Sequence, residues 1–176
     1  MKKGIDPSAM SPVSSEQRRE TAPKSIALRY LGYRSRTVSE MERYLQRVGF
    51  GPDEVRETVA WLMDLGYLDD ERFAAEWISS RAAGRKMGPR RLRAELSAKG
   101  VAREVIDAAL ASFDHRDVRE HAMEAAGKRA AQLQHVDPVR AKRRLYGYLH
   151  RLGYGHEVIV EVVARVLSQR RHGAPG

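Results

Sequence analysis

Apolar residues recur at helical spacing along this chain. In two places, four of them fall at i, i+1, i+4 and i+5, which defines one face of a helix. These are Ile26, Ala27, Tyr30 and Leu31, and then Phe73, Ala74, Trp77 and Ile78. We find no stretch with the strict alternation of apolar and polar residues that is typical of a half-buried strand. The pattern therefore predicts an all-α protein.

A second pattern, two helices hinged on a glycine, occurs three times at a period of about fifty residues. Each hinge glycine has Leu four residues before it and Met or Leu eight residues before it. An apolar residue follows directly, an acid comes four residues after, and apolar residues come six and ten after. The copies are Met41, Leu45, Gly49, Phe50, Asp53, Val55 and Val59; Leu92, Leu96, Gly100, Val101, Glu104, Ile106 and Leu110; and Leu145, Leu149, Gly153, Tyr154, Glu157, Ile159 and Val163. Agreement at six offsets predicts an internal repeat.

Each offset has a physical reason. Glycine accepts the left-handed conformation that ends a helix, and an acid in the first turn of the next helix is stabilised by the helix dipole. The middle helices also carry start signals: Thr37 and Glu40 form a capping box, and prolines follow Gly88 and Asp137. We predict nine helices in three units of three.

The repeats suggest domain boundaries. We expect a disordered N-terminal extension over 1–23, three-helix repeats over 24–65, 66–113 and 114–168, and a disordered tail over 169–176. The first helix of the third repeat has a thin apolar face of Ala122, Met123, Ala126 and Ala130. A three-helix unit of this size buries little surface, so we expect neighbouring repeats to stack into an elongated array.

The composition of the chain indicates the kind of partner and excludes some chemistry. The chain has 176 residues and a formal net charge of +9, which suggests a polyanionic partner, either nucleic acid or an acidic protein surface. It has no cysteine, so disulfide and thiol chemistry are excluded and a reducing compartment is expected. No apolar run approaches the about 20 residues of a membrane span.

Catalytic signals are missing from the sequence. The six histidines lack metal-ligand spacing, and no glycine-rich phosphate loop is present. Asp69 and Asp70 precede an apolar helix, where capping is the better interpretation than metal binding. Trp61 and Trp77 lie at core spacing, so we interpret them as packing residues. We predict a protein that is not an enzyme and has no metal and no cofactor.

Basic residues are concentrated on the middle helices of the second and third repeats. A charge run is usually a solvated face, but the repeated placement favours a functional positive stripe. The candidate binding residues are Arg81, Arg85, Lys86, Arg90, Arg91, Arg93, Arg140, Lys142, Arg143 and Arg144.

One stretch resembles a known family. It combines Gly66-Tyr67-Leu68-Asp69-Asp70-x-x-Phe73, Ile78 and Arg81 with Gly88-Pro89-x-x-Leu92-x-x-Glu95-Leu96 and Lys99-Gly100. This pattern resembles the RecX regulatory proteins of bacteria, and the resemblance covers Ser25 to Leu167. It implies a curved, all-helical, cytoplasmic protein of three tandem three-helix repeats.

The resemblance also implies a function. RecX proteins bind the filament of the recombinase RecA on DNA and inhibit its ATP hydrolysis, its strand exchange and its stimulation of LexA self-cleavage. It implies no cofactor, and it leaves open whether the protein also contacts single- or double-stranded DNA within the filament. We expect a monomer that does not bind membranes. The alternative is a helical protein that acts directly on DNA, because three short helices with a basic member are similar to a helix-turn-helix module.

Overall fold

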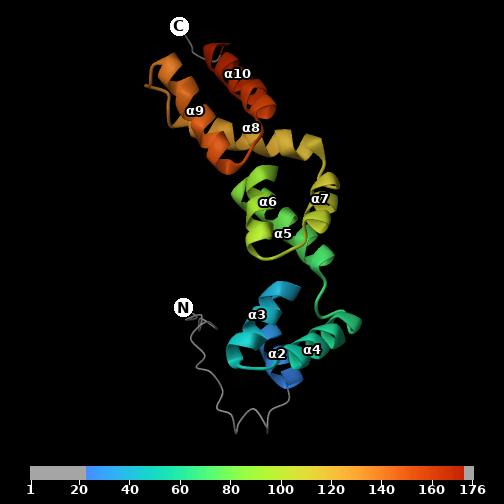
Figure 1. Cartoon of the computed structure of the whole chain (residues 1–176). Helices are drawn as coiled ribbons and strands as arrows, with labels where there is room; N and C mark the ends of the chain where they lie inside the picture. The colour runs from blue at the N-terminus through green and yellow to red at the C-terminus, as the bar shows by residue number, and fades with distance from the viewer. Residues whose placement is uncertain (1–22, 173–176) are drawn as a thin grey trace. The chain divides into compact units, whose positions relative to one another are not determined.

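The computed structural model describes residues 23–172, and within them it contains nine α-helices and no strand (Figure 1). The prediction of an all-α chain with nine helices is confirmed. The predicted disordered extension falls, except for Pro23, outside the described residues. The helices are α2 (Pro23–Leu31), α3 (Val38–Val48), α4 (Pro52–Asp64), α5 (Asp70–Arg85), α6 (Pro89–Ala98), α7 (Arg103–Ala111), α8 (His115–Ala131), α9 (Pro138–Leu152) and α10 (His156–His172).

The predicted repeat boundaries after residues 65 and 113 fall in the connections that follow α4 and α7. The three repeats themselves stay a prediction. At the C-terminal end the prediction needs a correction, because α10 continues to His172, into the range expected to be a tail from residue 169. Val162, Val163 and Val166 bury the inner face of α10, which holds this long helix against its neighbours.

The helix ends follow the sequence signals. Gly49, Gly100 and Gly153 all have positive φ, at 101°, 81° and 91°, so each ends its helix in a conformation that favours glycine. The Thr37 hydroxyl accepts a hydrogen bond from the amide of Glu40, which completes the predicted capping box. These capping predictions are confirmed.

The first compact unit comprises the described residues up to Phe73 together with Lys99–Val101. Its core forms where α2, α3 and α4 pack together, with Met41, Leu45 and Leu62 fully buried. Tyr30 and Tyr44 stack there, with ring centroids 3.7 Å apart. The repeat offsets therefore correctly predicted the inward face of α3.

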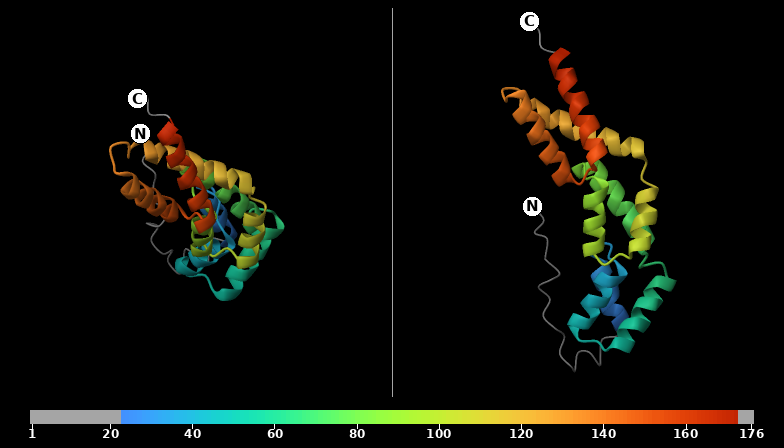
Figure 2. Two further views of the ribbon diagram at one scale, coloured as in Figure 1. Left: turned by 90° about the horizontal axis from the view of Figure 1, so that it is seen from above. Right: turned by 45° about the horizontal axis from the view of Figure 1, so that its top comes forward.

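The second compact unit comprises Ala74–Ala98 and the described residues from Ala102 onward. Helices α8, α9 and α10 pack on one another around Leu145, Leu149 and Ile159, and Figure 2 shows α9 in orange beside α10 in red. The small residues of α8 are buried in the same core as the branched side chains of Ile159, Val162, Val163 and Val166 of α10, so its thin apolar face suffices for packing.

Burial agrees with the repeat at nearly every apolar offset. The residues four and eight before each hinge glycine, and those one and six after it, are all buried, whereas Leu110 is half-buried. Trp61 and Trp77 are also only half-buried, so their interpretation as packing residues holds in part. The indole nitrogen of Trp77 donates to Glu95, at 3.2 Å.

One hydrogen bond to a backbone carbonyl occurs in each unit at equivalent positions of the repeat. In the second unit, the Gly88 amide donates to the Leu152 carbonyl at 2.7 Å. In the first unit, the Thr37 hydroxyl donates to the Lys99 carbonyl at 2.7 Å. Both donors lie directly before a middle helix, and both acceptors directly precede a hinge glycine. The contact therefore joins the start of a middle helix to the residue before a hinge glycine.

We expect Gly88→Ala to destabilise the protein, because a Cβ at Gly88 would lie 2.6 Å from the backbone of Gly153 and Tyr154. Such overpacking against backbone costs roughly 1–3 kcal/mol. Gly84→Ala is the matched control, since a Cβ there meets nothing within 4 Å and alanine suits a helix better. Thermal unfolding should show a lowered Tm for the first variant alone. Equal Tm values for the two variants would contradict the close contact.

Candidate functional site

Helix α9 presents two chemically distinct faces. Ala141, Leu145 and Leu149 recur every four residues and are fully buried. Arg140, Arg144 and Arg151 recur on the next face at intervals of four and seven residues and are exposed, with Arg143 beside them. At a rise of about 1.5 Å per residue, this arginine row extends for about 16 Å. We call Arg140, Arg143, Arg144 and Arg151 the arginine face.

Two cavities open along the arginine face. One, of about 280 Å³, is lined by Arg143, Arg144, Gly147 and Arg151, together with Arg129 from α8. The other, of about 370 Å³, is lined by Val139, Arg140, Arg143 and Arg144. Neither has a carboxylate in its lining, so planar guanidinium groups are left to bind an incoming carboxylate or phosphate.

Arg129 was not predicted as a site residue. It lies on α8, and one of its terminal nitrogens donates to Gln132 at 2.6 Å. Its Nε is buried and makes no hydrogen bond within the described part of the chain. Only tertiary packing brings it to α9, so no local signal in the sequence could have found it.

The basic residues before and within α6 differ from those of α9 because acids of the same unit neutralise several of them. Lys86 pairs with Glu124, Arg91 with Glu95 at 3.5 Å, and Arg93 with Asp107. Arg81 lies over the Trp77 ring, 4.2 Å from its centroid. Arg85 and Arg90 are exposed.

Hydrogen bonds from Lys128 and Lys86 lower the pKa of Glu124 to about 2, which keeps this carboxylate charged beside Lys86. The structure does bring the two basic segments together at one point, because the Arg90 amide donates to the Gly153 carbonyl at 3.0 Å. The start of α6 therefore meets the end of α9. Whether the two segments act as one stripe stays a prediction.

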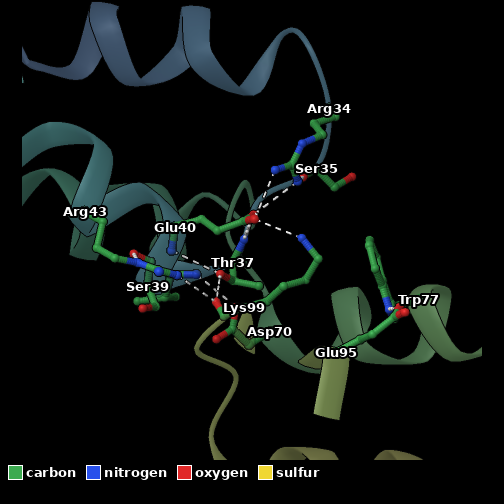
Figure 3. A network of polar contacts seen from close by, with 11 residues as sticks. Arg34, Ser35, Thr37, Ser39, Glu40, Arg43, Asp70, Trp77, Glu95 and Lys99 are labelled. Atoms are coloured by element: carbon green, nitrogen blue, oxygen red, sulfur yellow. Dashed lines mark hydrogen bonds and ion pairs between the residues drawn. The ribbon is translucent and has the colours of Figure 1, made fainter. Parts of the chain in front are cut away.

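The first unit carries a polar network around Glu40 (Figure 3). The Glu40 carboxylate receives hydrogen bonds from Arg34 at 3.0 Å and from Lys99 at 2.9 Å. Asp70, expected to cap its own helix, accepts instead from the Val38 amide at 3.0 Å, whereas Asp69 caps as predicted by accepting from Arg72. Val38 begins α3, so Asp70 stabilises the start of a different helix.

Arg36 is a buried cation whose burial was not predicted from the sequence. It is only 4% exposed, and its guanidinium carbon lies 4.0 Å from the centroid of the Tyr30 ring. Burial lowers the pKa of Arg36. Its Nε and Nη2 make no hydrogen bond among the described residues, so the tyrosine ring is the contact that offsets its desolvation.

The Glu40 network should make stability depend on acid pH. Burial alone would raise the pKa of Glu40, but hydrogen bonds from Arg34 and Lys99 outweigh it and lower the pKa to about 2 from 4.5. Because the pKa of Glu40 is depressed in the folded state, the contribution of Glu40 to the free energy of unfolding is complete above pH 4.5. This contribution is lost as the pH falls towards 2.

The measurement is urea unfolding of the wild type and Glu40→Gln over this pH range. Their difference in unfolding free energy should shrink as pH falls. Glu57→Gln is the control, because Glu57 is an exposed acid of the same unit and its substitution should change the unfolding free energy little. A constant difference for Glu40→Gln would count against the network.

Other chemistry is limited in the described residues. They contain no group of three or more His, Cys, Asp or Glu side chains that could hold a metal ion. The Nδ1 of His156 lies 2.9 Å from the Tyr146 hydroxyl, so this histidine has a local partner. Among the helices described, none is long and apolar enough to cross a membrane.

The comparisons with known proteins agree with one another. Residues 24–62 match the model of the RecX first three-helix domain, and residues 69–110 match the model of the RecX second three-helix domain. The regulatory protein RecX of Mycobacterium ulcerans is 37% identical over 161 residues, which cover 91% of this chain and 93% of the relative. That of Mycolicibacterium smegmatis is 35% identical over 158 residues, covering 87% and 84%.

Solved structures show the same fold. The crystal structure of RecX from Lactobacillus salivarius superposes with a TM-score of 0.78 at 23% identity, over 83% of this chain and 95% of that one. A second crystal structure of a regulatory protein RecX gives a TM-score of 0.71 at 23% identity, over 86% and 78%. At this identity the likeness concerns the fold.

The fold and the arginine face define an all-α protein of short helices with a cationic surface. The relatives make the assignment specific: the chain belongs to the RecX family of regulatory proteins. The resemblance stated from the sequence is thereby confirmed.

Proposed function

We propose that this chain is a cytoplasmic regulator that binds RecA–DNA filaments and inhibits their ATP hydrolysis, their strand exchange and their stimulation of LexA cleavage. The arginine face carries the proposal. Its guanidinium groups line two cavities without an opposing carboxylate. A RecA–DNA filament offers both protein carboxylates and DNA phosphates, and arginine binds either group with paired hydrogen bonds.

Direct binding to DNA is the second candidate, and the same cavities favour it because phosphate fits guanidinium groups as well as carboxylate does. The two functions differ in what the protein requires. A filament regulator needs assembled RecA, whereas a DNA-binding protein needs only the duplex or the single strand. Neither cavity of the arginine face is lined by Asn or Gln, the side chains that hydrogen-bond to adenine edges. This argues against sequence-specific recognition of DNA.

Co-sedimentation with RecA filaments tests the proposal. We expect the protein to pellet with filaments assembled on single-stranded DNA and to lower their ATP hydrolysis, while the protein alone hydrolyses no ATP. Bare DNA at the same salt concentration is the control. If the protein pelleted no better with filaments than with bare DNA and left the ATPase unchanged, the filament proposal would be wrong and the direct DNA-binding function favoured.

A further inference from the structure

A groove runs along α9 between the connection that precedes this helix and α10, and it borders the arginine face at Val139, which also lines the cavity of about 370 Å³. Its first part is a cavity of about 530 Å³ lined by Gln134, His135, Val136, Asp137, Pro138, Val139, Lys142 and Leu167. Its second part, of about 300 Å³, is lined by Lys142, Tyr146, Val160, Val163, Ala164, Leu167 and Ser168. Lys142 and Leu167 belong to both linings, so the two cavities adjoin.

The groove leaves apolar surface uncovered. Val139 is 77% exposed and Val160 is 49% exposed, and each lines a cavity together with Leu167. Val139, Lys142 and Tyr146 recur at intervals of three and four residues on α9, and Val160, Ala164 and Leu167 do so on α10. Two helices with matching rows form the kind of surface that receives the apolar side of a third helix.

Helix α9 is longer than its counterparts. It has 15 residues, whereas α3 has 11 and α6 has 10. Counted back from the hinge glycine, the additional turn lies at the N-terminal end, where Pro138 and Val139 line the larger cavity. This part of the groove has no equivalent on the other middle helices.

The charge around the groove indicates what would occupy it. Lys142 lies in both cavities, is exposed, and has no ion-pair partner among the described residues. Asp137 is the single acid in either lining, and one of its oxygens already accepts from the amides of Val139 and Arg140. An apolar groove beside an unpaired cation complements a segment that carries both apolar and acidic residues.

We propose that the groove between α9 and α10 binds an acidic amphipathic segment of a partner protein. Apolar side chains of the segment fill the two cavities, and a carboxylate pairs with Lys142. This contact is centred on Lys142 and Val160, which line neither cavity of the arginine face, and it does not depend on the proposed function. It gives the third group of helices a way to hold a protein partner in addition to a polyanion.

Three fluorescent probe peptides test the proposal by anisotropy. Each peptide has about 12 residues, with leucines at i, i+4 and i+7. The three peptides differ only at their polar positions, which carry Glu in the first, Gln in the second and Lys in the third. We expect the Glu peptide to bind about tenfold more tightly than the Lys peptide, because charge complementarity selects between otherwise equal partners. RecA is absent, so the result is independent of the filament proposal.

Two variants and a control make the test specific. Lys142→Glu should reverse the order of the Glu and Lys peptides, and Val160→Glu should abolish binding of all three. Arg116→Glu makes the same charge change at an exposed position of α8. It should leave the order of affinity for the Glu and Lys peptides unchanged. Circular dichroism checks that each variant is folded.

Several outcomes would overturn the proposal. They are no binding of any peptide, equal binding of the Glu and Lys peptides, or binding that survives both groove substitutions. Sedimentation velocity then measures whether the protein self-associates. If the wild type self-associates and Val160→Glu makes it monomeric, a second copy of this chain occupies the groove and the proposal is wrong.

Discussion

Reversing Arg140, Arg143 and Arg144 to glutamate should abolish inhibition of the RecA ATPase and co-sedimentation with filaments. Each substitution changes the local charge by two units on a face whose two cavities have no carboxylate in their linings. Charge reversal at three positions of one face replaces attraction by repulsion towards a carboxylate or phosphate of the partner. Arginine and glutamate are both good helix formers, so α9 should stay folded.

The control is Arg116→Glu with Arg165→Glu, two exposed arginines on α8 and α10 that line neither cavity. This pair should retain nearly full inhibition. Reversal of Arg90, Arg91 and Arg93 is less clean, because it also removes the ion pairs with Glu95 and Asp107. A folded α9 triple variant that still inhibits fully would rule out the arginine face as the binding surface.

Salt dependence separates the two candidate functions for the same α9 variant. If bare duplex DNA is the ligand, the wild type should bind it tightly, and affinity should fall steeply with salt because counterions are released. Charge reversal would then flatten that slope. If the filament is the ligand, bare duplex should bind weakly at physiological salt, while filaments still bind the wild type.

Leu96→Ala should strongly destabilise the second unit. Leu96 is fully buried on α6, and truncation of a buried leucine costs roughly 2–5 kcal/mol. For a chain of this size, each kcal/mol lowers the Tm by about 2–4 °C. The measurement is the midpoint of thermal unfolding followed by circular dichroism.

Leu65→Ala is the matched control, because Leu65 is 54% exposed in the connection between α4 and α5. Its effect should lie within about 0.5 kcal/mol. An equal loss of stability for the two variants would mean that the repeat offset does not mark the core.

The sequence carries most of the information on the helices and their inward faces because these depend on local chemistry. A glycine with positive φ, a proline at the first helical position and a leucine every fourth residue each act within one or two turns. Leu45, Leu96 and Leu149 are therefore all found buried at the predicted offset. The family was likewise evident from a stretch of motif residues.

The partners of charged side chains were not predictable in the same way. Lys86 and Glu124 are far apart in sequence, as are Arg93 and Asp107, and only packing of the helices pairs them. The same holds for Asp70, which a local pattern places as a cap of its own helix and which binds Val38 instead. A run of like charges thus contains both neutralised and exposed, unneutralised arginines, and no local pattern along the chain distinguishes the two kinds.

The contact between the start of a middle helix and the residue before a hinge glycine restricts how this protein can change length during evolution. It occurs between Thr37 and Lys99 and again between Gly88 and Leu152. An insertion within a middle helix, between the donor at its start and the hinge glycine after it, would rotate the residue before that glycine relative to the start of the helix. That residue could then no longer accept the hydrogen bond. Insertions and deletions among relatives should therefore accumulate in the α4–α5 and α7–α8 connections, and the spacing of 51 residues from Gly49 to Gly100 should vary only through the α4–α5 connection.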